Sequence, residues 1–326
     1  MSRPAGTRRV AAIDCGTNSL RLLIADADPA GRALTDIVRR MEIVRLGQGV
    51  DATGRLAPEA LARTLSVLAE YEESIRQAGA TAVRMVATSA TRDASNAADF
   101  TRGVIGILGV EPEVITGDEE ARLSFAGATA ELGAGVAAAP YLVVDIGGGS
   151  TEFVVGPAGG CTGPAAADLA AISVNIGCVR LTERHLHADP PDAAEIRAAI
   201  SDIDAALKTA AAAVPVASAR TLAGVAGSVT TVAAIALGLT HYDPSRTHHA
   251  RLPADLVHQV TCELLGQTRE QRAAIPSLHP GRVDVIGAGA LVLDRIMAQF
   301  GFAAVVVSEH DILDGIAWSM AVGGGS

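Results

Sequence analysis

Lysine is almost missing from this chain. Of its 26 basic residues only Lys208 is a lysine, and the rest are arginines. A phosphate-binding loop that ends in Gly-Lys-Ser/Thr is therefore excluded, and lysine Schiff-base chemistry has a single candidate. Lys208 lies in an alanine-rich stretch, where we expect a solvent-exposed helix face.

Aromatic residues and positive charge are also scarce. Aromatics make up 3% of the chain, and 36 acidic residues against 26 basic ones give a net charge of −10. Few aromatics argue against an all-β sandwich and against a protein that stacks nucleic-acid bases. The negative charge would repel a nucleic-acid backbone. The remaining composition, 326 residues with 49% hydrophobic and 34 glycines, indicates a turn-rich α/β chain long enough for two domains, with no nucleic-acid partner.

Cysteine pairs and long apolar helices are absent as well. The four cysteines form no Cys-x-x-Cys pair, so neither a disulfide framework nor a zinc site is expected. The basic N-terminus leads into an apolar stretch too short for a secretory signal, which predicts a cytoplasmic protein. Residues 221–242 carry no charged side chain, but their glycines and hydroxyl residues favour a loop and buried helix over a membrane span. We expect no membrane partner.

An internal repeat is present. Residues 10–24 align without gaps on residues 141–155, so that Asp, Gly and Ser coincide in the two copies. In each copy an apolar run predicts a buried strand, Asp-x-Gly-x-x-Ser predicts a tight turn, and the next apolar run predicts a returning strand. Each copy is therefore expected to form a hairpin with a polar tip.

The remaining sequence alternates strand and helix patterns. Strands are expected at 34–46, 82–87, 112–116, 171–176, 221–225 and 303–308, and helices at 58–78, 97–108, 118–129, 181–185, 193–213, 228–238, 253–265, 283–300 and from 312 onward. This order, repeated twice, predicts two α/β lobes, each on its own sheet, with a cleft that holds both tips. We place the N-terminal lobe at 1–125 plus 308–326 and the C-terminal lobe at 126–307.

The tips suit phosphate and a cation. Glycine at a turn lets backbone N–H groups approach an anion closely, and hydroxyl and amide side chains add donors. Carboxylates at the strand ends can hold a divalent cation through oxygen ligands. The phosphate-binding candidates are Gly16, Thr17, Asn18 and Ser19 in the first tip and Gly147, Gly148, Gly149 and Ser150 in the second; the carboxylates are Asp14 and Asp145.

Four segments, residues 13–19, 87–96, 115–123 and 144–152, resemble the exopolyphosphatase and guanosine pentaphosphate phosphohydrolase (Ppx/GppA) family of the actin, hexokinase and Hsp70 superfamily. The resemblance runs from residue 10 to about 321. It implies two actin-like (ribonuclease H-like) lobes, each a mixed sheet flanked by helices, and hydrolysis of terminal phosphoryl groups with Mg²⁺ or Mn²⁺. The chain ends before the extra helical domains of longer members, which suggests the short, two-lobed branch.

The resemblance assigns Glu120 as the general base that activates water. From the residues alone, an acidic first helical turn is also favoured by the helix dipole, with Thr116 or Asp118 as a cap. Because Glu119 and Glu120 are adjacent, one of them should turn outward.

The resemblance also makes Asp145 and Glu152 metal-associated, with Asp14 as a further metal candidate. Arg21 stands in the first copy where Glu152 stands in the second, so one tip would favour metal and the other substrate. The alternative is that Glu152 and Arg21 are outward-facing strand residues.

Arg92 and Asn96 match family residues that contact phosphate, although an arginine at the start of a helix is also commonly solvated. Residues 224–228, including Gly227 and Ser228, would add a backbone nest in the second lobe. Further cationic candidates are Arg21, Arg246, Arg251 and Arg282.

Two histidine-containing patterns are interpreted as structural. The segment 308–314 reads as a capping box of Ser308 and Asp311 at the start of the last helix. The pairs His185/His187 and His248/His249 have metal-like spacing but no evident supporting cluster, so we expect surface histidines.

Together these observations predict a metal-dependent exopolyphosphatase that removes the terminal phosphate of inorganic polyphosphate. Alternatives are a pppGpp 5′-phosphohydrolase or a nucleoside triphosphate/diphosphate phosphatase, which act on a similar terminal phosphate, a sugar or acetate kinase of the superfamily, and a non-enzymatic nucleotide-gated module. The oligomeric state stays open, with a homodimer allowed.

Overall fold

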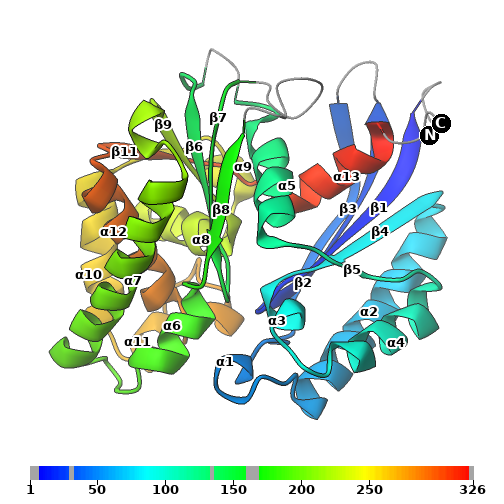
Figure 1. The fold of residues 1–326 in the computed structure, drawn as a ribbon, viewed down its shortest axis with the longest axis horizontal. Coiled ribbons are helices and arrows are strands. Elements are labelled where there is room, and N and C mark those ends of the chain that lie inside the picture. The colour runs from blue at the N-terminus through cyan, green and yellow to red at the C-terminus, as the bar shows by residue number, and fades with distance from the viewer. Residues whose placement is uncertain (1–6, 29–32, 133–135, 159–168, 323–326) are drawn as a thin grey trace. The chain divides into compact units, whose positions relative to one another are not determined.

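The computed structural model describes residues 7–28, 33–132, 136–158 and 169–322 (Figure 1). The chain divides into two compact units, a first unit of Met1–Gly127 with Ile312–Ser326 and a second unit of Ala128–Asp311. The sequence-based boundaries after 125 and 307 lie slightly earlier, so the segment 308–311, placed in the N-terminal lobe above, belongs to the second unit.

The first unit is built on a five-stranded mixed sheet of order β3-β2-β1-β4-β5. Its strands are β1 (Arg8–Cys15), β2 (Ser19–Asp28), β3 (Ala33–Ile43), β4 (Ala82–Ala87) and β5 (Glu113–Val114). β1, β2 and β3 pair antiparallel, whereas β4 pairs parallel with β1 and β5 parallel with β4. The helices are α1 (Val50–Thr53), α2 (Pro58–Ala78), α3 (Ser89–Arg92), α4 (Ala97–Leu108), α5 (Gly117–Thr129) and α13 (Ile312–Val322).

Both faces of β1 are buried. Ala11 and Ile13 belong to the core shared with α2 and α4, and Val10 and Ala12 belong to the core shared with α13. Alternate residues of a strand point to opposite faces, so a strand covered on both sides reads as a continuous apolar run. α13 is also tied to β3, because Arg39 donates to the buried Asp314 at 2.6 Å.

The second unit is built on a six-stranded mixed sheet of order β10-β11-β9-β6-β7-β8. Its strands are β6 (Tyr141–Ile146), β7 (Thr151–Gly156), β8 (Ala170–Val174), β9 (Thr221–Val225), β10 (Arg251–Pro253) and β11 (Ala304–Val307). β6, β9 and β11 run parallel, which brings their carboxyl ends to one edge of the sheet.

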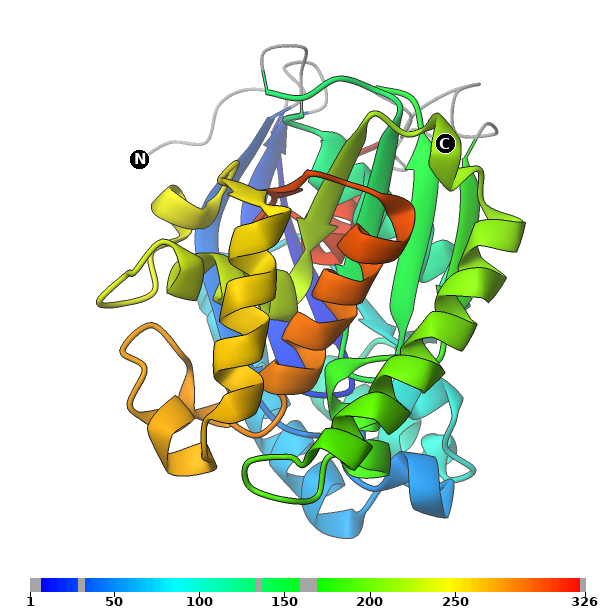
Figure 2. The same cartoon turned by 90° about the vertical axis from the view of Figure 1, so that its left-hand side faces the viewer.

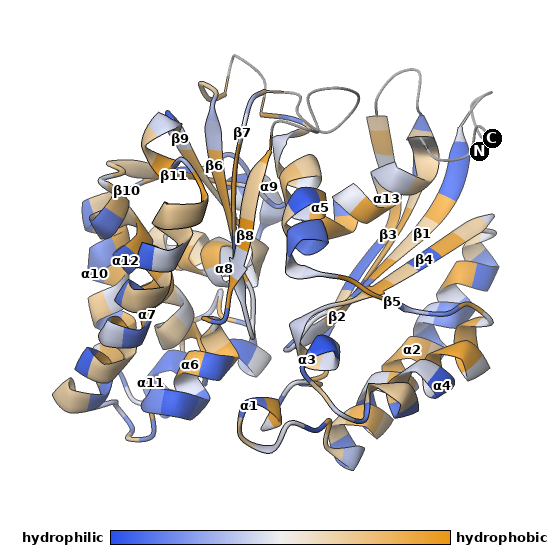
Figure 3. Cartoon of the chain, viewed as in Figure 1, coloured by the Kyte–Doolittle hydropathy of each residue, from blue (hydrophilic) through white to orange (hydrophobic). Residues whose placement is uncertain are grey.

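The helices of the second unit include a layer that covers one face of its sheet. Figure 2 shows α7, α10 and α12 side by side in front of the strands, and their apolar residues share one core with the sheet. The helices are α6 (Cys178–His185), α7 (Ala193–Ala213), α8 (Ala226–Ala236), α9 (Pro244–Thr247), α10 (Ala254–Gly266), α11 (Arg269–Ala273) and α12 (Ile286–Phe300). In Figure 3 the helices carry both hydrophobic and hydrophilic residues, as expected for helices that cover a sheet on one side and meet water on the other.

The predicted fold class, two mixed sheets flanked by helices, is confirmed. α2 lies where its sequence signals place it, with Pro58 in the first turn and Gly79 as a left-handed C-cap. The predicted strand 34–46 ends at Ile43, and 112–116 shortens to β5. The short elements α1, α3, α9, β10 and α11 were not predicted, because so few residues show no periodicity.

The charge-free stretch 221–242 contains β9 and α8, both largely buried. Within the described ranges no helix is both long and apolar enough to cross a membrane. Lys208 is exposed on α7, as predicted.

Candidate active site

The two hairpin tips close with the same turn. The Gly16 N–H donates to the Ser19 carbonyl at 3.0 Å, and the Gly147 N–H donates to the Ser150 carbonyl at 3.1 Å. The predicted repeat is therefore a structural repeat, with β1–β2 in the first unit and β6–β7 in the second.

The first hairpin carries a neutralised carboxylate. Asp14 and Arg21 are cross-strand partners, and the Arg21 guanidinium donates twice to Asp14 Oδ2, at 2.9 and 2.7 Å. Asp14 is buried and Arg21 only partly exposed. The structure thus pairs two of the predicted site residues with each other, so that the charge of Asp14 is compensated by Arg21.

The second hairpin carries two carboxylates at the equivalent position. Asp145 and Glu152 are cross-strand partners and are 7% and 1% exposed. Directly opposite residues of an antiparallel pair project to the same face of the sheet, so both carboxylates share one buried face. Glu152 Oε1 accepts a hydrogen bond from the Ser173 hydroxyl at 2.7 Å. The alternative that Glu152 is an outward-facing strand residue is wrong.

Two such carboxylates favour a cation. Like charges directly opposite each other are destabilising, and burial makes the charged forms costlier still. Carboxylate oxygens are hard ligands of the kind that Mg²⁺ prefers. The donor set of Asp145 and Glu152 therefore fits a divalent cation.

Residues of α6 donate hydrogen bonds to the glycine tip of the second hairpin. The carbonyls of Gly147 and Gly148 accept hydrogen bonds from the N–H groups of Cys178 and Val179 at 3.0 and 2.9 Å, and the Gly149 carbonyl accepts from Arg180 Nε at 2.7 Å. These three carbonyls point toward α6, where they are hydrogen-bonded. The backbone N–H groups of the tip can therefore serve as donors to an anion.

Gly177 lies directly against this tip. A Cβ at Gly177 would lie 2.4 Å from the Gly148 carbonyl oxygen, so no side chain fits there. Sequence reasoning missed Gly177 and Arg180, because neither belongs to the hairpin motif.

The first tip contains an unsatisfied amide. Asn18 is 6% exposed, and neither end of its side-chain amide has a hydrogen-bond partner among the described residues. Next to Asn18 in the chain, Thr17 Oγ1 lies 2.9 Å from Ser89 Oγ of α3. Buried polar groups without partners are rare in native proteins and call for an explanation such as a ligand. Asn18 therefore fits its predicted role as a phosphate donor.

Glu120 lies in the first turn of α5 and is buried. Arg92 NH1 donates to Glu120 Oε2 at 3.3 Å and to the Ile115 carbonyl at 2.9 Å. The Glu119 side chain instead is half-exposed and pairs with Arg84 at 3.0 Å, so one of the adjacent glutamates turns outward as predicted. The Thr116 hydroxyl accepts from the Glu119 N–H at 3.2 Å, so Thr116 serves as the cap.

The structure gives Asn96 a different role from the one the sequence predicts. Its Oδ1 accepts from the Leu56 N–H at 2.8 Å, and its Nδ2 donates to the Leu56 carbonyl at 3.1 Å. Both ends of the amide are thus bound to one backbone residue. Asn96 therefore ties α4 to the loop before α2.

The nest at the start of α8 has an arginine beside it. A Cβ at Gly227 would lie 2.0 Å from Arg282 Cζ, so the guanidinium packs directly on this glycine. Ala226 has a φ of 67° and Ser228 is buried. The helix dipole of α8 disfavours a cation such as Arg282 at its N-terminus. An anion bound between Arg282 and the N-terminus of α8 would be favoured by the guanidinium and by the helix dipole. The other two candidates, Arg246 and Arg251, are exposed.

Two interpretations of the histidine-containing segments are wrong. Ser308 Oγ accepts from the His310 N–H at 3.1 Å, and α13 begins only at Ile312, so Ser308 makes a local turn and not a capping box. His248 does have a supporting cluster, since Glu131 and His310 lie close to it.

Comparison with known proteins decides the family. The profile of the Ppx/GppA phosphatase family matches residues 23–322. The chain belongs to this family. As a Ppx/GppA protein it is 51% identical over 324 residues to exopolyphosphatase 2 of Mycobacterium tuberculosis (strain CDC 1551 / Oshkosh), covering 96% of this chain and 98% of the relative. The predicted family, and with it the prediction of an enzyme of the phosphatase class, is confirmed.

Solved structures agree with this membership. An exopolyphosphatase-like protein is 43% identical with a TM-score of 0.90, covering 96% of this chain and 98% of the other. An exopolyphosphatase from Cytophaga hutchinsonii is 25% identical with a TM-score of 0.86, covering 97% and 98%. A Ppx/GppA protein from Aquifex aeolicus is 29% identical with a TM-score of 0.78, covering 98% and 99%.

Proposed function

We propose that this chain is an exopolyphosphatase that hydrolyses the terminal phosphoanhydride bond of inorganic polyphosphate. The observation that carries the chemistry is the buried carboxylate pair Asp145 and Glu152 on the hairpin that also bears the glycine tip. The choice of substrate is supported by the full-length likeness to a relative named exopolyphosphatase 2.

Glu120 acts as the general base in this proposal. The water oxygen attacks the terminal phosphorus, its proton passes to the Glu120 carboxylate, and the bond from that phosphorus to the bridging oxygen breaks. Orthophosphate leaves together with a polyphosphate one unit shorter. Arg92, which the resemblance assigns to phosphate, also positions the base in this proposal, because its contacts with Glu120 and with the Ile115 carbonyl fix where the carboxylate lies.

Asp145 and Glu152 would hold Mg²⁺ or Mn²⁺. When bound, such a cation neutralises phosphate oxygens and stabilises charge that develops during phosphoryl transfer. Asp14 contributes less in this proposal, because Arg21 already compensates its charge.

Each unit carries its own candidate phosphate donors. In the first unit these are the tip Gly16–Ser19 with the unsatisfied Asn18 amide. In the second unit they are the tip Gly147–Ser150 and the start of α8 with Gly227, Ser228 and Arg282. In a chain of net charge −10, such local donors are what a polyanion needs.

The test is phosphate release measured side by side on long polyphosphate, short polyphosphate, pppGpp and ATP with Mg²⁺. Release from polyphosphate at the highest kcat/KM supports the proposal. Preference for pppGpp would make the chain a pppGpp 5′-phosphohydrolase. Transfer of the phosphoryl group to an added organic acceptor, in place of phosphate release, would make it a kinase.

A further inference from the structure

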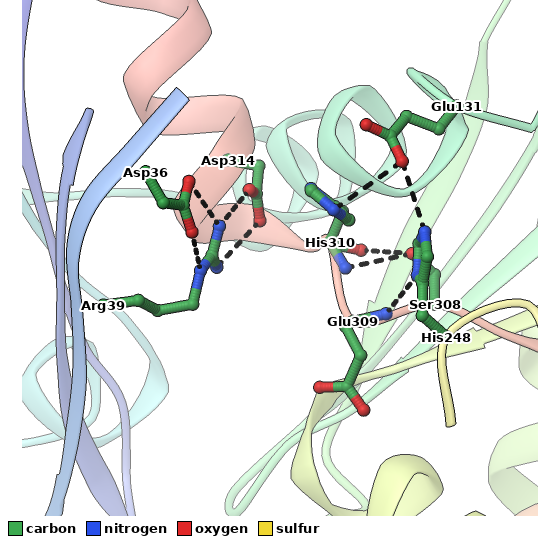
Figure 4. Close-up of polar contacts among 8 residues, drawn as sticks. All are labelled: Asp36, Arg39, Glu131, His248, Ser308, Glu309, His310 and Asp314. Carbon is green, nitrogen blue, oxygen red and sulfur yellow. Dashed lines mark hydrogen bonds and ion pairs between the residues drawn. The ribbon is translucent and has the colours of Figure 1, made fainter. Parts of the chain in front are cut away.

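A second group of possible metal ligands lies in the second unit, apart from the hairpin tip. Glu131 follows α5, His248 follows α9, and His310 follows β11. Glu131 Oε2 lies 3.2 Å from His248 Nε2 and 3.8 Å from His310 Nε2, and one ligand atom of each residue lies within 4.8 Å of the others. Figure 4 shows both imidazoles turned toward the same carboxylate.

We propose that Glu131, His248 and His310 bind a divalent transition-metal cation, with Zn²⁺ as the type. Two imidazoles and one carboxylate form a ligand set that suits zinc and neighbouring first-row metals, and it leaves a position open for water. Hard cations such as Mg²⁺ prefer oxygen ligands, so this site and the Asp145/Glu152 pair would select different metals.

The spacing of the ligand atoms agrees with this coordination. Zinc bonds of roughly 2.0–2.1 Å at tetrahedral angles place ligand atoms about 3.4 Å apart. The distances of 3.2 and 3.8 Å from Glu131 Oε2 lie on either side of that value. Small side-chain rotations are enough to complete the set.

The protonation of His248 also bears on binding. Burial lowers the pKa of His248, and the neighbouring His249 and His310 lower it further, while Glu131 opposes them. A neutral imidazole is the form that ligates metal.

Metal binding must change the tautomer of His248. Its Nδ1 accepts from the Glu309 N–H at 3.2 Å, so Nε2 carries the proton and donates it to Glu131. Coordination through Nε2 moves this proton to Nδ1 and replaces the Glu309 hydrogen bond, which is already at the long end of the usual range. The chemical shifts of the His248 ring nitrogens and of the Glu309 amide therefore report directly on coordination.

Two of the proposed ligands lie near the points where the chain passes from one unit to the other. The chain passes between its two units after Gly127 and after Asp311. Glu131 lies shortly after the first passage, and His310 lies shortly before the second. A cation bound to both would join these two connecting segments within the second unit, and we expect it to raise the melting temperature of the protein and to slow hydrogen exchange in both segments.

The experiment uses the full chain, stripped of metal and kept in excess Mg²⁺ so that oxygen-ligand sites are saturated. Zn²⁺ binding is measured by calorimetry, and Co²⁺ serves as a spectroscopic probe. The parent protein and all variants carry Cys262→Ser. Cys262 Sγ lies 3.6 Å from His258 Nε2 on α10, and these two residues could form a competing Zn²⁺ site.

We expect one Zn²⁺ per chain and a Co²⁺ spectrum without thiolate charge-transfer bands. Glu131→Gln and His310→Asn should each weaken Zn²⁺ at least tenfold, since even outer-shell changes cost 10–100-fold. His187→Asn, an exposed histidine of the same unit, should leave the affinity unchanged. Equal Zn²⁺ affinity in all variants, or no stoichiometric binding in the parent, would overturn the proposal. Glu131 is exposed, so its variant keeps the test valid even if His310→Asn does not fold.

Discussion

Arg92 NH1 lies 3.3 Å from Glu120 Oε2 and also donates a hydrogen bond to the carbonyl of Ile115, which precedes the start of α5 by two residues. One guanidinium therefore fixes both the carboxylate and the backbone that leads to it. In the proposed mechanism Glu120 is the general base, which must be held within hydrogen-bond reach of its water, and the contact with Arg92 would supply that restraint.

Replacing Glu120 by glutamine keeps its size but removes its ability to take a proton. We expect kcat for polyphosphate to fall by roughly 10²- to 10⁴-fold, the usual value of a general base, with KM little changed. Steady-state phosphate release checks this. Glu119→Gln is the matched control, since the Glu119 side chain is half-exposed and pairs with Arg84, and should stay within a few-fold of the parent. Activity of Glu120→Gln equal to that of the control would exclude the residue from the chemistry.

The two hairpins offer a matched test of the cation site. EDTA should abolish hydrolysis, and Mg²⁺ or Mn²⁺ should restore it. Asp145→Asn should raise the metal concentration needed for half-maximal activity, because one oxygen ligand loses its charge. Asp14→Asn changes the equivalent residue, whose charge Arg21 compensates, and should shift this concentration much less. Equal shifts in both variants would contradict the assignment of the metal to the second hairpin.

Gly177 should tolerate no side chain. In Gly177→Ala the new methyl group would lie 2.4 Å from the Gly148 carbonyl oxygen, so the glycine tip must move. We expect a loss of about 1–3 kcal/mol in the free energy of unfolding, as for other overpacked positions, and a higher KM for polyphosphate. Gly266→Ala is the control, because nothing lies within 4 Å of a Cβ there. Thermal melts and KM values that match this control would show that the tip can adapt.

The cysteines should differ in reactivity. Burial raises the pKa of Cys15 and of Cys178, although Arg282 opposes the shift at Cys178, and the thiolate is the reactive form. Cys262 is exposed. Brief treatment of the native protein with iodoacetamide should therefore modify Cys262 well ahead of Cys15 and Cys178, as read by peptide mass spectrometry. In guanidinium chloride Cys15, Cys178 and Cys262 should all react. Similar rates for these three in the native protein would contradict the buried positions of Cys15 and Cys178.

The sequence predicted those parts of the site that local patterns encode. The hairpins follow from strand alternation around Asp-x-Gly, and the opposed Asp145 and Glu152 follow from the register of a short turn. The role of Asn96 could not be foreseen, since it depends on Leu56, a residue 40 positions away. The Glu131, His248 and His310 cluster is equally non-local, because three separate segments bring it together. Tertiary packing, and not any periodicity, decides such contacts.

The first unit is discontinuous, and this affects how the protein is made. α13 covers one face of β1 and β2, and its Asp314 is buried against Arg39. On the ribosome these strands emerge early, but the helix that covers them emerges only after the entire second unit has been translated. Domains usually fold in the order of synthesis. Here Val10, Ala12 and Leu23 can be covered by α13 only after the second unit has been synthesised, so the core of the first unit cannot be completed earlier.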